Sequence, residues 1–194
     1  MLNILVFRIN LIDQMKSCMN QTVNIDWYFV TFVTYNSRIS ERMIQYNSFE
    51  FIKELKPLIF SYTERILITE IILDQCNKYQ IKVAGINVLP DHVHMVIAAS
   101  DIEDLNNKVK LIKGGSSFLF KRTLSYKKNS PRIWATSYHL EVHKTEIDLR
   151  NILHYINNNH FKHSIRWGDK LITEYDEGLK PLIDKACVEI DSIY

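Results

Sequence analysis

The chain is poor in residues that mark several classes of protein. It has only three cysteines in 194 residues, Cys18, Cys76 and Cys187, which lie far apart and form no Cys-x-x-Cys pair. This spacing argues against a disulfide framework and a zinc–thiolate site, and it fits a reducing cytoplasm. Five glycines and four prolines are too few for a low-complexity or disordered chain.

Long apolar runs and a secretion leader are also missing. No uninterrupted apolar stretch is long enough to span a bilayer, so we expect no membrane partner. Residues 1–12 are apolar but lack a basic leader and a small-residue cleavage pattern, which argues against a signal peptide. Apolar residues make up 46% of the chain and charged residues 24%, as is typical of a soluble globular domain with a sizeable core.

The formal net charge is only +2, but the charges are unevenly distributed. Between Leu105 and Leu140 there are eight basic residues and no acidic residue, so the rest of the chain is net acidic. The eight are Lys108, Lys110, Lys113, Lys121, Arg122, Lys127, Lys128 and Arg132. A basic third on a nearly neutral protein suggests a face that binds a polyanion, although a solvated helix surface is an equal alternative.

Apolar periodicity predicts an alternation of strands and helices. β-Branched and aromatic residues predict strands at 27–35, 81–88, 92–98 and 133–142. Three helices are predicted: one from about Tyr62, one from about Asp101 through the basic stretch, and one over 145–159. Within the second helix, Gly114–Gly115 is expected to mark a bend or a close approach to another element. Residues 36–47 are expected to form a polar connection, and Pro57 to break the helical pattern that begins at Phe49.

This order predicts an α+β fold, the ferredoxin-like split βαβ sandwich. A four-stranded antiparallel sheet would carry two crossover helices on one face, plus an additional C-terminal helix bearing Tyr155. We expect the domain to cover residues 26–167. Residues 1–25 would be an N-terminal extension, in which Met15 or Met19 is an alternative start, and residues 168–194 a C-terminal tail.

Two histidines could hold a metal. In the strand His92-Val93-His94 side chains alternate, so both imidazoles face one side while Val93 and Met95 face the other. Imidazoles about 7 Å apart along one face can converge on a single divalent ion. A surface pair with no metal is the alternative.

Tyr155 is a candidate nucleophile. A tyrosine hydroxyl has a pKa near 10 and is a weak nucleophile, but beside a metal that polarises a phosphate it can attack in line. Asn159 lies four residues later on the same helix face, and its side-chain oxygen could complete the coordination of the metal. The alternative is that Tyr155 only packs its helix on the sheet.

These residues resemble a known family. Residues 89–96 (LPDHVHMV) resemble the HUH signature of single-tyrosine HUH transposases, in particular the insertion-sequence-200-like and REP-associated branch. Residues 28–38 (YFVTFVTYNSR) are similar to the first strand of that family, and residues 108–122 to its basic helix. Ile133, Trp134 and Tyr138 resemble its fourth strand, and residues 154–163 (HYINNNHFKH) its Tyr-x-x-x-Asn helix.

The chain departs from the family at two positions. Asp91 replaces the asparagine that commonly precedes the first histidine, and His160 replaces the proline that often follows the metal-binding asparagine. No third histidine is identified for the three-histidine cluster of replication initiators and relaxases.

The resemblance implies a metal-dependent single-stranded DNA transposase and endonuclease. Magnesium or manganese would be bound by His92, His94 and Asn159, and Tyr155 would form a 5′-phosphotyrosine intermediate at a DNA hairpin. The side chains expected to contact backbone phosphates are those of Lys110, Lys113, Lys121 and Arg122. The resemblance places the protein in the bacterial cytoplasm, associated with the nucleoid, and leaves open whether it acts as a monomer or a homodimer.

Alternatives remain for the function and for the other histidines. The chain could be a host factor that binds DNA hairpins without transposition, or a ferredoxin-like RNA-binding module, although the RNP signature is absent. The alternating side chains of His139, Glu141 and His143 could form a second metal site, with a solvent face as the stronger reading. His154, His160 and His163 could contact phosphate, but a wet helix end is the preferred interpretation for each.

Overall fold

The structure, a computed structural model, describes residues 25–37, 57–127, 129–143 and 145–188. Its elements are β1 (Asp26–Val33), α4 (Tyr62–Lys78), β2 (Val83–Val88), β3 (His92–Ala99), α5 (Ile102–Thr123), β4 (His139–His143), α6 (Glu146–Trp167), α7 (Lys170–Glu174), η1 (Tyr175–Leu179) and α8 (Lys180–Ala186). The predicted N-terminal extension, except Ile25, most of the predicted polar connection and the helical pattern before Pro57 lie outside the described residues.

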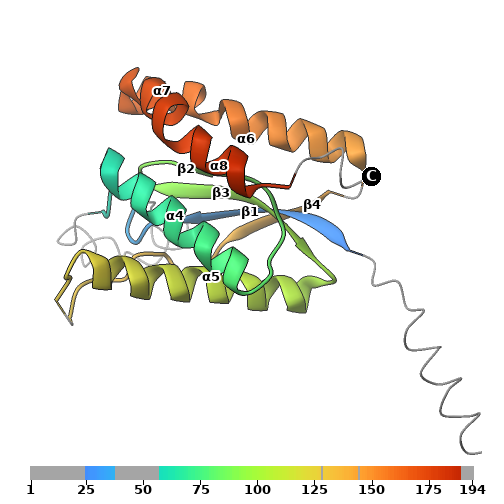
Figure 1. Cartoon of the computed structure of the whole chain (residues 1–194), viewed down its shortest axis with the longest axis horizontal. Coiled ribbons are helices and arrows are strands. Elements are labelled where there is room, and N and C mark those ends of the chain that lie inside the picture. Colours follow the sequence, from blue (N-terminus) through green and yellow to red (C-terminus); the bar gives the residue numbers. More distant parts are fainter. Residues whose placement is uncertain (1–24, 38–56, 128, 144, 189–194) are drawn as a thin grey trace, which may run out of the picture.

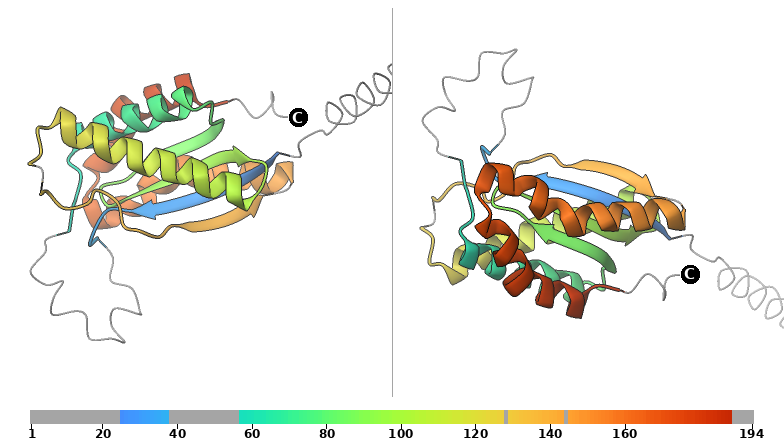
Figure 2. Two further views of the ribbon diagram at one scale, coloured as in Figure 1. Left: turned by 90° about the horizontal axis from the view of Figure 1, so that it is seen from below. Right: turned by 90° about the horizontal axis from the view of Figure 1, so that it is seen from above.

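The four strands form one antiparallel sheet in the order β2-β3-β1-β4. This is the strand order of the split βαβ arrangement, so the predicted α+β, ferredoxin-like fold is confirmed. Figure 1 shows the sheet between two helical layers, with α4 and α5 on one side and α6 on the other. The views from below and above in Figure 2 show α5 crossing one face and α6 crossing the opposite face.

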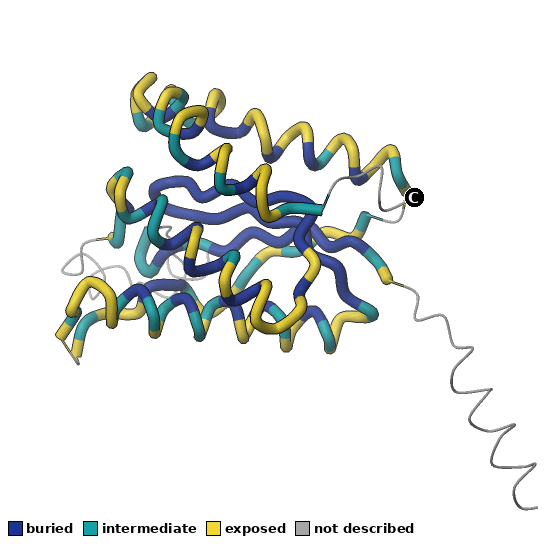
Figure 3. The backbone as a smooth tube through the Cα atoms, viewed as in Figure 1, coloured by how far each residue is buried: buried dark blue, intermediate teal, exposed yellow. Residues whose placement is uncertain are grey.

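The face under α4 and α5 holds the larger core. Alternate residues of β1 (Tyr28, Val30 and Phe32) pack there with Val93, Met95 and Ile97 of β3 and with buried residues of both helices. Figure 3 shows β2 and β3 as buried along their whole length, with exposed positions on the outer sides of the helices. The predicted close approach occurs at Gly115, where a Cβ would lie 2.1 Å from Gln75 Oε1 of α4.

The opposite face packs against α6. Trp27, Phe29, Val96 and Ala98 of the sheet form a second core with the helix residues Leu149, Leu153 and Ile156. Gly85 of β2 lets the helix come close, because a Cβ there would lie 2.5 Å from Leu153 Cδ2. Asn87 is buried beside it and donates a hydrogen bond to the Ile156 carbonyl at 2.9 Å. The second core therefore fixes α6, and the side chains it carries, against β2 and β3.

Residues 170–186 form helices within the segment that the sequence predicted as a C-terminal tail. The apolar residues Leu171, Tyr175, Leu179 and Ile183 are buried at intervals of four, and the last three of them join the core under α4. The guanidinium of Arg65 on α4 is buried and bonds Glu174 at 3.1 Å, which ties α7 to α4. These helices thus pass from α6 to α4 and brace the sheet at its β2 side.

The fourth strand is shorter than predicted. β4 begins at His139, and residues 133–138 instead follow an irregular path with one bridge between Thr34 and Trp134. Lys113 of α5 donates to the carbonyl oxygens of Thr136 and Ser137 at 3.0 and 3.1 Å. Two backbone acceptors of this segment are therefore paired with a side chain instead of with β1. Across the described ranges, none of the helices combines the length and apolar character that a membrane span requires.

Candidate active site

His92 and His94 lie on the α6 face of β3, as the strand alternation predicted. Their neighbours Val93 and Met95 point to the opposite core. Both imidazoles are buried, and their Nε2 atoms lie 3.1 Å apart. Two nitrogen ligands that are each about 2.1 Å from one ion are separated by about 3.0–3.4 Å. The pair is therefore already spaced as two ligands of a single metal ion would be.

Both rings have their second nitrogen engaged. Asp91 is buried, and its Oδ1 accepts from His92 Nδ1 at 2.5 Å, while His94 Nδ1 bonds the Thr31 hydroxyl at 2.7 Å. A carboxylate can only accept, so the proton of neutral His92 resides on Nδ1 and the lone pair of Nε2 faces His94. Asp91, in place of the asparagine that the family commonly has there, thus fixes the orientation of the His92 ring.

Helix α6 carries three polar side chains at intervals of four residues, Tyr155, Asn159 and His163, and the first and last of them contact this pair. The Tyr155 ring lies 5.7 Å from the His94 ring and 6.1 Å from the Phe29 ring, measured between centroids. Tyr155 keeps 37% of its surface exposed, so a large substrate can reach it. Asn159 is one turn further on and buried, and neither atom of its amide has a hydrogen-bond partner among the described residues.

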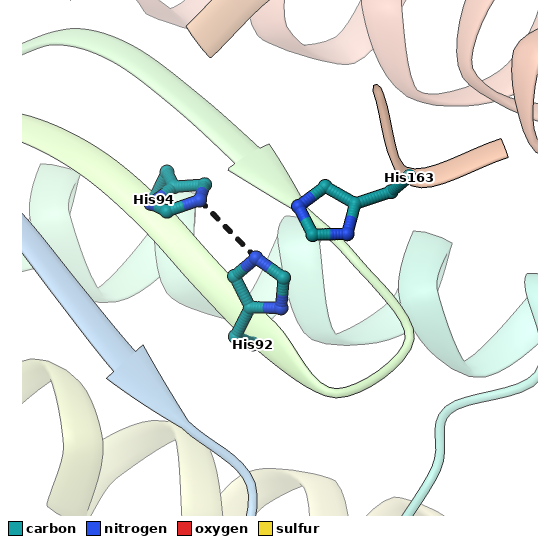
Figure 4. A group of neighbouring side chains, drawn as sticks. All are labelled: His92, His94 and His163. Atoms are coloured by element: carbon teal, nitrogen blue, oxygen red, sulfur yellow. Dashed lines mark hydrogen bonds between the residues drawn. The ribbon is translucent and has the colours of Figure 1, made fainter. Parts of the chain in front are cut away.

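His163, one turn beyond Asn159, is the residue that sequence reasoning missed. Its ring centroid lies 4.8 Å from that of His92. One ring nitrogen from each of His92, His94 and His163 lies within 4.8 Å of the others, so the three could hold a metal ion (Figure 4). The expectations that no three-histidine cluster exists and that His163 sits on a wet helix end are therefore wrong. The available signal was the four-residue spacing that His163 shares with Tyr155 and Asn159.

Asn159 fits a metal-binding role. A buried amide with no partner costs about 1–3 kcal/mol, so a fold that keeps one needs a compensating interaction. The two Nε2 atoms lie 3.1 Å apart, a separation that a shared proton or a shared cation satisfies. Three imidazole nitrogens and one amide oxygen form a donor set that suits a divalent metal.

The other two histidines of α6 do not join the site. His154 is exposed and lies beside Asn158 on the outer side of the helix. His160 is buried, and its ring stacks on Tyr175 at 4.1 Å between centroids, so the wet-helix-end interpretation is wrong for this residue. Burial lowers its pKa below the usual value, which favours a neutral ring. His160 therefore joins α6 to the C-terminal helices, and the helix continues where the family often has proline.

Strand β4 carries a separate polar group. His139 and Glu141 form an exposed pair at 3.1 Å, and His143 meets the edge of the Phe29 ring. An exposed pair of this kind contributes little to stability. The exposed His139 and Glu141 side chains are typical of a solvent-facing strand surface, the alternative that the sequence favoured over a second metal site.

The predicted DNA-contacting residues lie on the other side of the sheet. α5 packs on the face opposite α6, so Lys110, Lys113, Lys121 and Arg122 are separated from Tyr155 by the sheet (Figure 2). A pocket of about 400 Å³ between α5 and residues 132–138 is lined by Lys110, Lys113, Lys121 and Arg132, and none of the described residues in its lining is acidic. Burial lowers the pKa of Lys113 to about 8.

Comparison with known proteins identifies the family. The sequence profile described as "Transposase IS200 like" matches residues 34–159, more than half of the chain. The chain belongs to the IS200-like transposase family, which makes it a transposase-type protein. The matched range contains His92, His94, Tyr155 and Asn159 and ends before His163.

Two solved structures are similar to the chain. One is the structure of a REP-associated tyrosine transposase bound to a REP hairpin, with a TM-score of 0.45 and 19% identity over 71% of this chain and 68% of that chain. The other is a provisionally named transposase from Deinococcus radiodurans R1, with a TM-score of 0.40 and 17% identity over 69% of this chain and 88% of that chain. No curated protein matches the sequence.

Proposed function

We propose that the protein cleaves and rejoins single-stranded DNA at hairpin sites, with Tyr155 as the nucleophile. The observation that carries the proposal is the convergence of α6 on β3. A half-exposed phenol lies 5.7 Å from the ring of His94, on the helix face that also carries Asn159. Membership of the IS200-like transposase family supports the same chemistry.

The chain's own residues account for the positioning. Tyr155 Oη would attack the scissile phosphorus, the bond to the 3′ oxygen would break, and a 5′-phosphotyrosine would form. The proton lost by the phenol is balanced by the one that the 3′ oxygen takes up, and a 3′-hydroxyl of a second strand reverses the step without ATP. A divalent ion held by His92, His94 and Asn159 would polarise the phosphate. The Lys162 amine, 5.8 Å from the centre of the Tyr155 ring, adds positive charge beside the nucleophile.

Covalent capture tests this proposal. Purified full-length protein, incubated with manganese and a library of labelled single-stranded hairpins, is expected to form an adduct that survives denaturing electrophoresis and disappears after protease treatment. Protein that binds hairpins but forms no adduct with any of them would contradict the proposal and favour the hairpin-binding host factor.

The basic side of α5 is proposed to bind the DNA backbone, with Lys110, Lys113, Lys121 and Arg122 as the contacting residues. The substitution Lys110→Ala removes an exposed cation at the rim of the 400 Å³ pocket. A plot of the logarithm of the hairpin-binding constant against the logarithm of the salt concentration should become less steep, with a slope smaller in magnitude by about 0.9 for one lost duplex phosphate contact. The control Lys185→Ala removes an exposed cation of α8. An unchanged slope for Lys110→Ala would place the DNA elsewhere.

A further inference from the structure

The side chain of His163 lies beside the two histidines of β3 and outside the range that the family profile matches. The match to the family ends at Asn159, so His163 and Arg166 are features of this chain beyond the matched range. Figure 4 shows the His163 ring reaching from its own segment toward the histidines of β3. The three rings each offer a nitrogen within 4.8 Å of the other two.

An ion pair holds His163 opposite His92. Arg166, one turn after His163, donates to Asp91 Oδ2 at 2.9 Å, and the other oxygen of Asp91 bonds His92. The end of α6 is thereby joined to the residue that orients the first imidazole. The Asp91 carboxyl group is fully buried, whereas the side chain of Arg166 is half-exposed.

We propose that His163 is a metal ligand, and that the site consequently takes a first-row transition metal ion in preference to magnesium. This inference rests on the proposed function, because it concerns the ion of the same site. Magnesium prefers six oxygen ligands at about 2.1 Å and gives up water reluctantly. Imidazole ligands suit zinc, copper, iron and nickel, and the affinity of such sites rises from manganese through cobalt and nickel to copper, with zinc below copper. Three imidazoles and one amide therefore select against magnesium.

Metal binding without DNA tests the inference. Full-length protein, titrated with cobalt(II) and followed by visible absorption, should develop the d–d bands of a nitrogen-ligated ion, and zinc should abolish them. Magnesium in millimolar concentration should not compete. His163→Ala should weaken cobalt affinity at least about tenfold, the lower end of what loss of a group supporting a metal ligand costs. Arg166→Gln should weaken it less, and with the cobalt spectrum retained.

The control is His154→Ala, which removes an exposed histidine from the same helix. His163→Gln provides a second variant that keeps a polar side chain, and circular dichroism shows whether each variant folds. Wild-type cobalt affinity in both folded His163 variants, or displacement of cobalt by magnesium, would overturn the inference. The two proposals fail separately. Tight cobalt binding by a protein that forms no DNA adduct would contradict only the proposed function. Adduct formation together with wild-type cobalt affinity in the His163 variants would contradict only the metal role of His163.

Discussion

Tyr155→Phe is expected to abolish the covalent protein–DNA adduct and to leave hairpin binding within about threefold, as for a substitution that conserves shape. The phenyl ring keeps the edge contacts that Tyr155 makes with Phe29 and His94. Only the oxygen that would attack phosphorus is lost. Adduct formation is measured by denaturing electrophoresis, and binding by fluorescence anisotropy of the same labelled hairpin.

Tyr79→Phe is the matched control, because Tyr79 is an exposed tyrosine at the end of α4, with 39% of its surface accessible against 37% for Tyr155. This variant should form adduct at the wild-type level. An adduct that persists in Tyr155→Phe would show that another residue is the nucleophile. Loss of binding together with the adduct would instead give Tyr155 a role in holding DNA.

Local periodicity was enough to predict the sheet, the shared face of His92 and His94, and the shared helix face of Tyr155 and Asn159. The β-branched stretch of β1, the short turn before β3 and the alternation around Val93 are all set by neighbouring residues, and each matches the structure. The four-residue spacing of Tyr155 and Asn159 likewise needed only helix geometry. These features depend on contacts within one element or one hairpin.

The remaining features depend on contacts between distant segments. The ion pair of Asp91 and Arg166 joins residues 75 positions apart, and no spacing rule connects a strand end to a helix end. The position of His163 depends on α6 continuing to Trp167, whereas the sequence pattern indicated an end near Asn159. The four-residue spacing on α6 therefore places His163 on the same helix face as Tyr155 and Asn159, but it does not predict that this face packs against His92 and His94.

The C-terminal helices did leave a signal in the sequence. Residues buried at intervals of four, from Leu171 to Ile183, drift by about 40° per step around a regular α-helix, which blurs the pattern. The π-helical turn η1 (Tyr175–Leu179) holds more residues per turn and brings the apolar side chains back into line. A wider turn is rarely anticipated from sequence, which explains why these residues looked weakly patterned.

The double substitution His92→Ala and His94→Ala is expected to reduce adduct formation about a thousandfold or more with every divalent metal, because the polarisation supplied by a bound metal is worth several kcal/mol. Both rings are buried and lie with Nε2 atoms 3.1 Å apart, and β3 contains no other histidine that could replace them. Single-turnover rates with manganese, cobalt and magnesium measure the effect.

Strand β4 offers the control, since His139→Ala and His143→Ala remove the histidines at its two ends, which lie outside the cluster of His92, His94 and His163. That variant should cleave at the wild-type rate. Removing two buried rings can also destabilise the fold, so the melting temperature is measured, and His94→Gln is compared as a variant that leaves His92 and Asp91 paired. A folded double variant that still cleaves with an unchanged metal dependence would separate the chemistry from this face of β3. The ion that polarises the phosphate beside Tyr155 would then have to be held by residues other than His92 and His94.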